Sequence, residues 1–561
     1  MNIKTKFQNV KSVDDRARYV LSPVKVIKTW GYVENAENLL ADAASQVAFD
    51  NALTPQGVVE PVILRNDGGE HAAILLDFGR EIHGTFKIYN DVPWVNARIR
   101  LGESISEAIT PVHGEKNATN DHAVRDMDFP VSAMSYTETA ESGFRFAYVE
   151  LLDEEKEMRL MSAEAVLICY DMPEIGWFKS SDEKLNKIYD TAAYTLNLCM
   201  QRYVWDGIKR DRLVWIGDMN PEIKTTLALY GKNKPIERSL DFIRDLTPAS
   251  DSMCGISSYS VWWVICHYDY FFGTGDMEYL AEQKAYLMEL LPRLASYAGD
   301  DGEEQLPGTK FIDWPNKANE KATHAALQGL LRLGLLRGAE LMRILGERKL
   351  ALMCAEAAGK LLQVIPDPDG SKQAAAFLAR SGVADPAEMA EKVLLPGGAK
   401  GYSTFLGYYT LAATAKAGRH DEALDILRTY WGRMLDMGAT TFWEDFNMDW
   451  AENAYGIDSL PVEGKDDIHG DFGGYCYENL RHSLCHAWSS GPVPYLTEEV
   501  LGVKFIAPGG KMIAVEPHLS DLTFAEGEVP TAFGVIRVRH EVGADGKIKT
   551  DLTLPEGVTL V

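Results

Sequence analysis

The chain has 561 residues, of which 46% are hydrophobic and 25% charged, so we expect several folded domains rather than a disordered chain. Its formal net charge of −26 would repel nucleic-acid phosphates and anionic membranes, and neither is an expected partner. The seven cysteines form no CxxC pair, and their odd number favours reduced thiols over a disulfide framework. The N-terminus lacks a signal-peptide pattern, and the chain has no run of about 18 apolar residues. We therefore expect a cytoplasmic protein without a membrane-spanning helix.

Residues 1–175 have the pattern of a β-rich domain. Strand-like runs begin at Val58, Ala72, Gly84, Trp94 and Phe144. Turn residues such as those of 66–69 separate these runs, and short strands at this spacing predict an antiparallel, jelly-roll-like β-sandwich. A helix over residues 33–48 is expected to lie beside it.

The period of the apolar residues changes after Ser181. Leu185, Ile188 and Ala192 recur at steps of three and four residues, which is typical of a helix. Further helices are predicted at 221–230, 234–246, 258–272, 277–298, 320–345, 348–362, 371–382, 386–393, 402–417, 420–436 and 474–488. Paired helices without a fixed repeat length favour an (α/α)6 toroid over a solenoid, and we assign this domain to residues 176–500.

The last residues, 501–561, return to a period of two. Alternating runs begin at Gly510, Asp521, Thr531 and Lys547. They predict a small antiparallel β-sandwich packed on the helices. The predicted fold class is therefore a multidomain α and β protein, in which N-terminal and C-terminal β-sandwiches flank the toroid.

The segment 206–218 has the highest density of candidate functional residues. It contains Asp206, Arg210, Asp211, Trp215 and Asp218. Buried charges must be paired or hydrogen-bonded, so few core elements tolerate such a mixture. A sugar pocket uses it, because carboxylates supply acid–base chemistry, Arg donates from a planar fork and Trp offers an apolar plate. The alternative is a solvated loop with ion pairs and a core tryptophan.

Three later segments add candidates. They are 440–444 with Trp443 and Glu444, 311–314 with Asp313 and Trp314, and 483–492 with His486 on a predicted helix. Each has an alternative in the core, where an indole or a hydrogen-bonded histidine is equally at home. The histidines are dispersed without an HExxH motif, and phosphate-loop and nucleophile-elbow motifs are missing. We therefore expect neither a metal nor another cofactor.

These segments resemble motifs of the glycoside hydrolase family 78 α-L-rhamnosidases. The block 206–218 is similar to the family's Asp-x-x-x-Arg-(Asp/Glu)-Arg-x-x-Trp-x-Gly-Asp, and 440–444 is similar to its Thr-Thr-x-Trp-Glu. Asp313-Trp314 resembles the family's pocket-lining pair, the patch around His486 lies where the family has a sugar-binding histidine, and 77–81 resembles its accessory sandwich. The order of elements extends the resemblance over most of the chain. It implies an inverting, exo-acting hydrolase that releases terminal α-L-rhamnose from a carbohydrate substrate.

The resemblance also implies roles for individual residues. Asp211 would be the general acid and Glu444 the general base. The sugar subsite would consist of Asp206, Arg210, Trp215, Asp218, Asp313, Trp314, Trp443 and His486. Many relatives carry Glu where this chain has Asp211, whose side chain is one methylene shorter. If Asp211 only pairs with an arginine, Asp206 or Asp218 would donate the proton instead.

Three other functions are compatible with the same residues. One is an inverting toroid glycosidase for a different sugar, since a fold does not fix a substrate. Another is a carbohydrate-binding relative without catalysis. A lyase on acidic sugars is a third, and the net charge of −26 argues against it. The sequence leaves open the aglycone, the linkage, the oligomeric state and whether the N-terminal sandwich binds carbohydrate.

Overall fold

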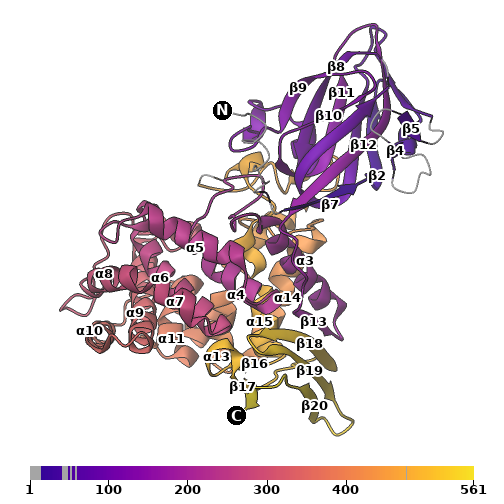
Figure 1. The fold of residues 1–561 in the computed structure, drawn as a ribbon. Helices are drawn as coiled ribbons and strands as arrows, with labels where there is room; N and C mark the ends of the chain where they lie inside the picture. The colour runs from indigo at the N-terminus through magenta and orange to yellow at the C-terminus, as the bar shows by residue number, and fades with distance from the viewer. Residues whose placement is uncertain are drawn as a thin grey trace, which may run out of the picture.

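The computed structural model describes residues 14, 16–40, 48–50, 54–56, 60–91, 93–475 and 477–561. The chain forms a β-rich region, then a helical region, then a second β-rich region that lies against the helices (Figure 1). This is the predicted multidomain α and β fold, with a helical part and largely antiparallel sheets. Within the described ranges, none of the helices combines the length and the apolar character needed to cross a membrane.

The N-terminal region is built around one long strand, β7 (Ala73–Asn90), which pairs with β11 (Ser142–Leu151) and β12 (Glu157–Cys169). The sheet follows the order β3-β6-β12-β7-β11-β8-β9. The other elements are β1 (Ala17–Leu21), β2 (Lys25–Trp30), β3 (Tyr32–Glu34), β4 (Ala48–Asp50), β5 (Thr54–Gln56), β6 (Val62–Arg65), β8 (Val95–Gly102), α2 (Ile105–Ile109), β9 (Asp126–Val131) and β10 (Ser135–Glu138). Alternate apolar side chains of these strands form a core of their own.

Two predictions for this region differ from the structure. The runs beginning at Ala72 and Gly84 are parts of the single strand β7, because the chain passes Gly79 in a left-handed conformation (φ 77°) and continues without a turn. In place of a helix over 33–48, residues Ala36–Leu39 form one 3₁₀ turn, and 41–47 lie outside the described residues.

The helical region contains most of the predicted helices. They are α3 (Glu183–Cys199), α4 (Met219–Leu229), α5 (Lys234–Leu246), α6 (Ser257–Thr274), α7 (Met277–Glu282), α8 (Lys284–Ala295), α9 (Glu320–Ile344), α10 (Arg348–Lys360), α11 (Lys372–Ser381), α12 (Pro386–Met389), α13 (Gly407–Lys416), α14 (His420–Asp436) and α15 (Pro492–Tyr495). Helices α6 and α11 are apolar on nearly every side and buried, whereas α5 is amphipathic and buries one stripe. Buried helices such as α6 and α11 therefore lie inside the domain, and amphipathic helices such as α5 cover them.

The predicted helix at 474–488 was wrong. The described part of this segment is irregular apart from the short 3₁₀ turns Asn479–Arg481 and Ala487–Ser490. Its backbone crosses the protein interior, where the N–H of His486 donates to the carbonyl of Phe442 at 3.0 Å and that of Ala487 to Asp206 at 2.7 Å. Apolar residues therefore face the protein on all sides, and their spacing imitates a helix.

The C-terminal region shares a strand with the segment that enters the helices. Strand β13 (Trp177–Ser180) pairs with β18 (Phe524–Thr531), which continues to β19 (Gly534–Val542) and β20 (Ile548–Thr553). Three more strands, β16 (Val503–Phe505), β17 (Met512–Val515) and β21 (Thr559–Leu560), form a second small sheet. Side chains of β13, β18 and β19 belong to the same apolar core as the helices, so the two regions are packed as one.

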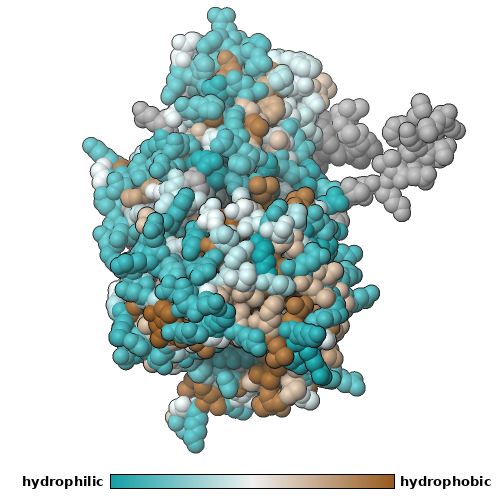
Figure 2. Space-filling model, turned by 90° about the vertical axis from the view of Figure 1, so that its left-hand side faces the viewer, coloured by the Kyte–Doolittle hydropathy of each residue, from teal (hydrophilic) through white to brown (hydrophobic). Residues whose placement is uncertain are grey.

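The outer side of the helical region is hydrophilic over most of its area, with separate apolar patches on its lower half (Figure 2). Such a surface fits a chain with a net charge of −26. The apolar residues of the helices are instead concentrated in the buried core.

Candidate active site

The segment 206–218 connects α3 to α4 and is folded around the carboxylate of Asp206. This carboxylate accepts the backbone N–H groups of Asp211 and Leu213, each at 3.0 Å. Gly207 pairs in a β-bridge with His486, which brings the C-terminal candidate segment alongside. Burial raises the pKa of Asp206 to about 7, and the Asp211 carboxylate adds to this effect.

Arg210 connects the two proposed catalytic carboxylates. One terminal nitrogen of its guanidinium lies 3.2 Å from Asp211 Oδ1, and the other lies 3.0 Å from Glu444 Oε2. Its Nε donates to the carbonyl of Arg481 at 2.8 Å, and its plane lies 4.5 Å over the ring of Tyr477. The fold thus brings Asp211 and Glu444, 233 positions apart in the sequence, to opposite ends of one guanidinium.

The two carboxylates differ in exposure. The Glu444 side chain is 2% exposed, and its Oε2 also accepts the backbone N–H of Ser483 at 3.1 Å. Burial raises the pKa of Glu444 to about 7, against the lowering effect of Arg210. The Asp211 side chain keeps 21% of its surface accessible. Asp211 is therefore the more accessible of the two carboxylates, and Glu444 is the buried one.

His486 lies among three buried carboxylates. Its Nε2 is 3.5 Å from Glu444, 3.8 Å from Asp206 and 4.0 Å from Asp218. Burial and the charge of Arg210 hold the pKa of His486 well below its usual range, so the ring is neutral. Burial, with Glu222 nearby, raises the pKa of Asp218 well above its usual range. Neutral and protonated groups at this depth are suited to exchanging hydrogen bonds with sugar hydroxyls.

Aromatic side chains line the same region. Trp314 is half-buried and packs against Tyr475 and Tyr477, with ring centroids 5.6 and 5.5 Å apart, and Tyr477 in turn lies under Arg210. Trp215 is half-buried against the edge of Tyr259. Trp443 is fully buried and packs on Phe446, so it belongs to the core beneath the site rather than to its accessible wall.

Asp313 lies at the start of the short 3₁₀ helix Trp314–Asn316. Its carboxylate accepts the N–H of Trp314 at 2.8 Å and the hydroxyl of Ser403. Burial raises the pKa of Asp313 to about 7, although the Ser403 hydrogen bond opposes this shift. Asp313 thus fixes the loop that presents Trp314.

Sequence reasoning missed His122, which comes from the N-terminal β-rich region. Its Nε2 lies 3.2 Å from Asp211 Oδ1, and its backbone carbonyl accepts a hydrogen bond from Arg212. Arg212 also donates to the carbonyl of Glu141 at 3.0 Å. A lone histidine between strands carries no motif, so only the packing of the two regions places it at the site. Tyr477 was missed as well, because a predicted helix covered its segment.

A buried lysine ties the site to the N-terminal region. The Nζ of Lys209 lies 3.1 Å from both Glu103 and Glu107, and these two acids also lie near His469. The grouping of Glu103, Glu107 and His469 has the donor types of a metal site. The ammonium of Lys209 already holds the position that a cation would take between the carboxylates, so this group is a structural ion cluster.

The second group with metal-binding donors is His420, Glu499 and His518. The two imidazoles are stacked with centroids 3.4 Å apart and planes at 10°. Parallel rings in contact cannot direct two in-plane lone pairs at one ion. Lys504 also lies 3.3 Å from Glu499. Neither of these two groups is therefore arranged to hold a metal ion.

Known proteins resemble this chain in sequence over parts of its length. The family model for the bacterial alpha-L-rhamnosidase 6 hairpin glycosidase domain matches residues 173–330, and the model for the bacterial alpha-L-rhamnosidase C-terminal domain matches residues 502–561. An alpha-L-rhamnosidase of Alteromonas sp. (strain LOR) is 31% identical over 164 residues, which are 28% of this chain and 15% of that protein. The match thus spans a small part of the length of this relative.

Solved structures extend the likeness to the whole fold. The family 78 rhamnosidase of Bacillus sp. GL1 superposes with a TM-score of 0.73 at 23% identity, covering 91% of this chain and 56% of that one. A rhamnosidase of Klebsiella oxytoca with rhamnose bound superposes with a TM-score of 0.67 at 21% identity, covering 86% of this chain and 96% of that one. The resemblance to the glycoside hydrolase family 78 α-L-rhamnosidases, predicted from the segments 206–218 and 440–444, is confirmed by the two family models and by this common fold.

Proposed function

We propose that this protein is an inverting, exo-acting glycoside hydrolase that releases terminal α-L-rhamnose. The observation that carries the proposal is the bridge from Asp211 through Arg210 to Glu444 in a site lined by buried acids and indoles. The matching family models and the rhamnose-bound neighbour from Klebsiella oxytoca support the choice of sugar.

In this mechanism Asp211 protonates the leaving glycosidic oxygen and Glu444 deprotonates a water on the opposite face of the sugar. Inverting enzymes need about 6.5–9.5 Å between the two carboxyl groups to admit that water. A guanidinium separates the carboxylates of Asp211 and Glu444, which supports the wider arrangement over direct contact. The exposures fit the roles, because the acid must reach the departing aglycone while the base acts at depth.

The remaining residues would bind and orient the sugar. Asp206, Asp218 and His486 exchange hydrogen bonds with its hydroxyls, and Arg210 donates to them. Trp215 and Trp314 shape the accessible wall, Asp313 fixes the loop that presents Trp314, and Trp443 supports Glu444 from the core. No step of this scheme draws on a metal or another cofactor.

We also propose that the helical region, residues 176–500, is an (α/α)6 toroid between β-sandwich domains of residues 1–175 and 501–561. Successive contacts run from α4 to α6, α9, α11, α13 and α15, and α15 returns to α4. These six helices form a closed inner ring, which supports the toroid. Strand β13, at the start of residues 176–500, pairs with strand β18 of the C-terminal sheet.

The test is hydrolysis of an aryl α-L-rhamnoside by wild type, Asp211→Asn and Glu444→Gln, with the exposed Asp245→Asn on α5 as the control. General acid–base catalysis contributes about 10²–10⁴-fold, so both site variants should lose at least about 100-fold in kcat and the control should lose nothing. NMR should show inversion at the anomeric carbon of the first product. An active Asp211→Asn would move the acid to Asp206 or Asp218.

Aryl glycosides of other sugars serve as a second arm. Turnover of another sugar in preference to rhamnose would overturn the substrate assignment and keep the mechanism. Rhamnose binding with no turnover of any glycoside would instead identify a carbohydrate-binding protein without catalysis.

A further inference from the structure

A cavity of about 780 Å³ lies at the far end of the helical region from the candidate active site. Asp218 precedes α4, whereas the cavity is lined by Lys224 and Ala228 near the end of that helix. Along α6, Tyr259 near the start contacts Trp215, and Phe272 near the end lines the cavity. Strands β16 and β18 of the C-terminal region close it. Its volume is within the range of small-molecule sites.

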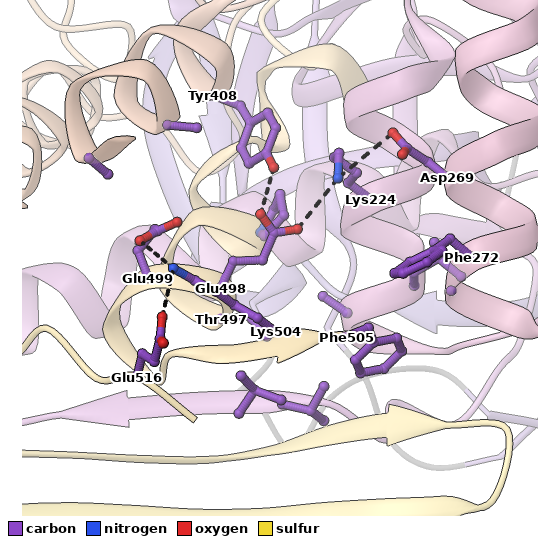
Figure 3. A pocket seen from close by; sticks show the side chains of 18 of the residues that line it. Lys224, Asp269, Phe272, Tyr408, Thr497, Glu498, Glu499, Lys504, Phe505 and Glu516 are labelled. Carbon is purple, nitrogen blue, oxygen red and sulfur yellow. Dashed lines mark hydrogen bonds and ion pairs between the residues drawn. The ribbon is translucent and has the colours of Figure 1, made fainter. Parts of the chain in front are cut away.

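Three lysines line this cavity, and each already has partners in the protein. Lys504 lies 3.3 Å from Glu499 and 3.9 Å from Glu516. Lys224 Nζ lies between Asp269 at 3.7 Å and Glu498 at 3.5 Å, and the Tyr408 hydroxyl donates to the other Glu498 oxygen at 2.6 Å (Figure 3). Lys416 donates to the carbonyls of Ala379 and Arg380 at the end of α11. All three ammonium groups are therefore satisfied by the protein.

Two guanidinium groups in the same cavity are not satisfied in this way. Arg337 lies 4.1 Å over the ring of Tyr268, and Arg380 lies 5.5 Å over Tyr408. Among the described residues, neither forms an ion pair with a carboxylate, and the buried Nε of Arg380 has no hydrogen-bond partner. The charges of Glu498 and Asp269 act on Arg380 from within the cavity, but both carboxylates already pair with Lys224. Two guanidinium groups that face one cavity without forming an ion pair of their own indicate a site for an anion.

The other walls indicate what kind of anion fits. Phe272 and Phe505 both line the cavity (Figure 3). Phe272 also stacks on Tyr268, with ring centroids 5.6 Å apart. These rings offer apolar plates to the face of a pyranose. Asp269 and Glu498 provide acceptors for hydroxyl groups, and they also disfavour a doubly charged phosphate.

We propose that this cavity binds a sugar acid, a pyranose that bears one carboxylate. The carboxylate pairs with Arg337 and Arg380, the ring lies against the aromatic wall, and the hydroxyls donate to Asp269 and Glu498. The site is separate from the candidate active site, and the proposal does not rest on hydrolytic activity.

Calorimetric titration with methyl β-D-glucuronide tests it, with the neutral methyl β-D-glucoside and inorganic phosphate as comparison probes. Wild type should bind the glucuronide at least about tenfold more tightly than either probe, because hydrogen bonds between charged groups add that much affinity. Arg337→Gln and Arg380→Gln should each weaken glucuronide binding about tenfold or more. Arg343→Gln, on the same helix as Arg337 but exposed, should bind as wild type does.

Because Arg337 and Arg380 lie on different helices, a folding defect in one variant would not affect the other. Thermal melting of each variant checks that it is folded. Excess L-rhamnose, which would enter the candidate active site, should not displace the glucuronide. Equal affinity for glucuronide and glucoside, equal or tighter binding of phosphate, displacement by rhamnose, or an unchanged Arg337→Gln would each overturn the proposal.

Discussion

Arg210→Gln tests whether the guanidinium between the two carboxylates sets the protonation state of the base. Arg210 lies 3.0 Å from Glu444 Oε2 and lowers a pKa that burial raises to about 7. Glutamine keeps hydrogen-bonding capacity and removes the charge. The pKa of Glu444 should therefore rise further in the variant.

The size of the effect follows from the distance. An opposite charge within about 4–6 Å lowers a carboxylate pKa by about 1–3 units, so removing it should shift the pKa upward by at least about one unit. A general base must be ionised, and the activity attributed to Glu444 is therefore lost as the pH falls through its pKa. In the variant, the pH at which kcat/KM reaches half of its maximum should be higher by at least about one unit, which is equivalent to about 1.4 kcal/mol.

The assay is the pH dependence of kcat/KM on an aryl α-L-rhamnoside, which reports the groups of the free enzyme. Arg212→Gln is the matched control, because Arg212 donates to backbone carbonyls of Glu141 and His122 rather than to Glu444. Its acidic limb should stay at the wild-type pH. An acidic limb that stays in place or moves to lower pH in Arg210→Gln would refute the electrostatic account of the base.

Three further predictions concern binding and stability. Burial raises the folded-state pKa of Asp313 to about 7, so wild type loses stability as the pH rises from about 4 to 7. Between pH 5 and pH 8, the unfolding free energy of Asp313→Asn should therefore rise by roughly 2–4 kcal/mol relative to that of wild type, as measured by denaturant titration. A difference in unfolding free energy that stays constant over this pH range would contradict the prediction. Trp314→Ala should raise KM for the rhamnoside about tenfold with a smaller change in kcat, whereas a loss confined to kcat would remove Trp314 from the binding wall. Lys209→Met should cost about 3–5 kcal/mol of unfolding free energy, because Glu103 and Glu107 lose a buried cation, and a loss below about 1 kcal/mol would show that the acids do not need it.

Local periodicity was sufficient to predict the amphipathic and buried helices and most strands. Helices α3 and α14 and strand β19 each bury one face, so their apolar residues recur at the helical or the strand period, and this period can be read from the sequence. The segment around His486 could not be predicted in this way. It is buried on several sides, so the spacing of its apolar residues imitates a helix and does not report its irregular backbone.

The motif residues were predictable as a group, but their arrangement was not. Asp206, Asp211 and Asp218 are close in sequence, and their grouping with Glu444 and His486 depends on contacts between remote segments. The carboxylate of Asp206 organises its loop by accepting backbone N–H groups, a role that composition does not reveal. The participation of the N-terminal region through His122 depends entirely on the packing of two regions.

The pairing of β13 with β18 has a consequence for any attempt to divide the chain. Strand β13, which leads into α3, and strand β18, which comes after β16 and β17 in the C-terminal region, are hydrogen-bonded neighbours, with Trp177 opposite Glu528. A fragment that stops at residue 500 would leave the edge of β13 unpaired and expose Phe178, which the C-terminal sheet now helps to cover. The start of the helical region is therefore held in place by hydrogen bonds to a C-terminal strand. Expression of a shortened catalytic fragment should yield aggregated protein unless both strands are kept.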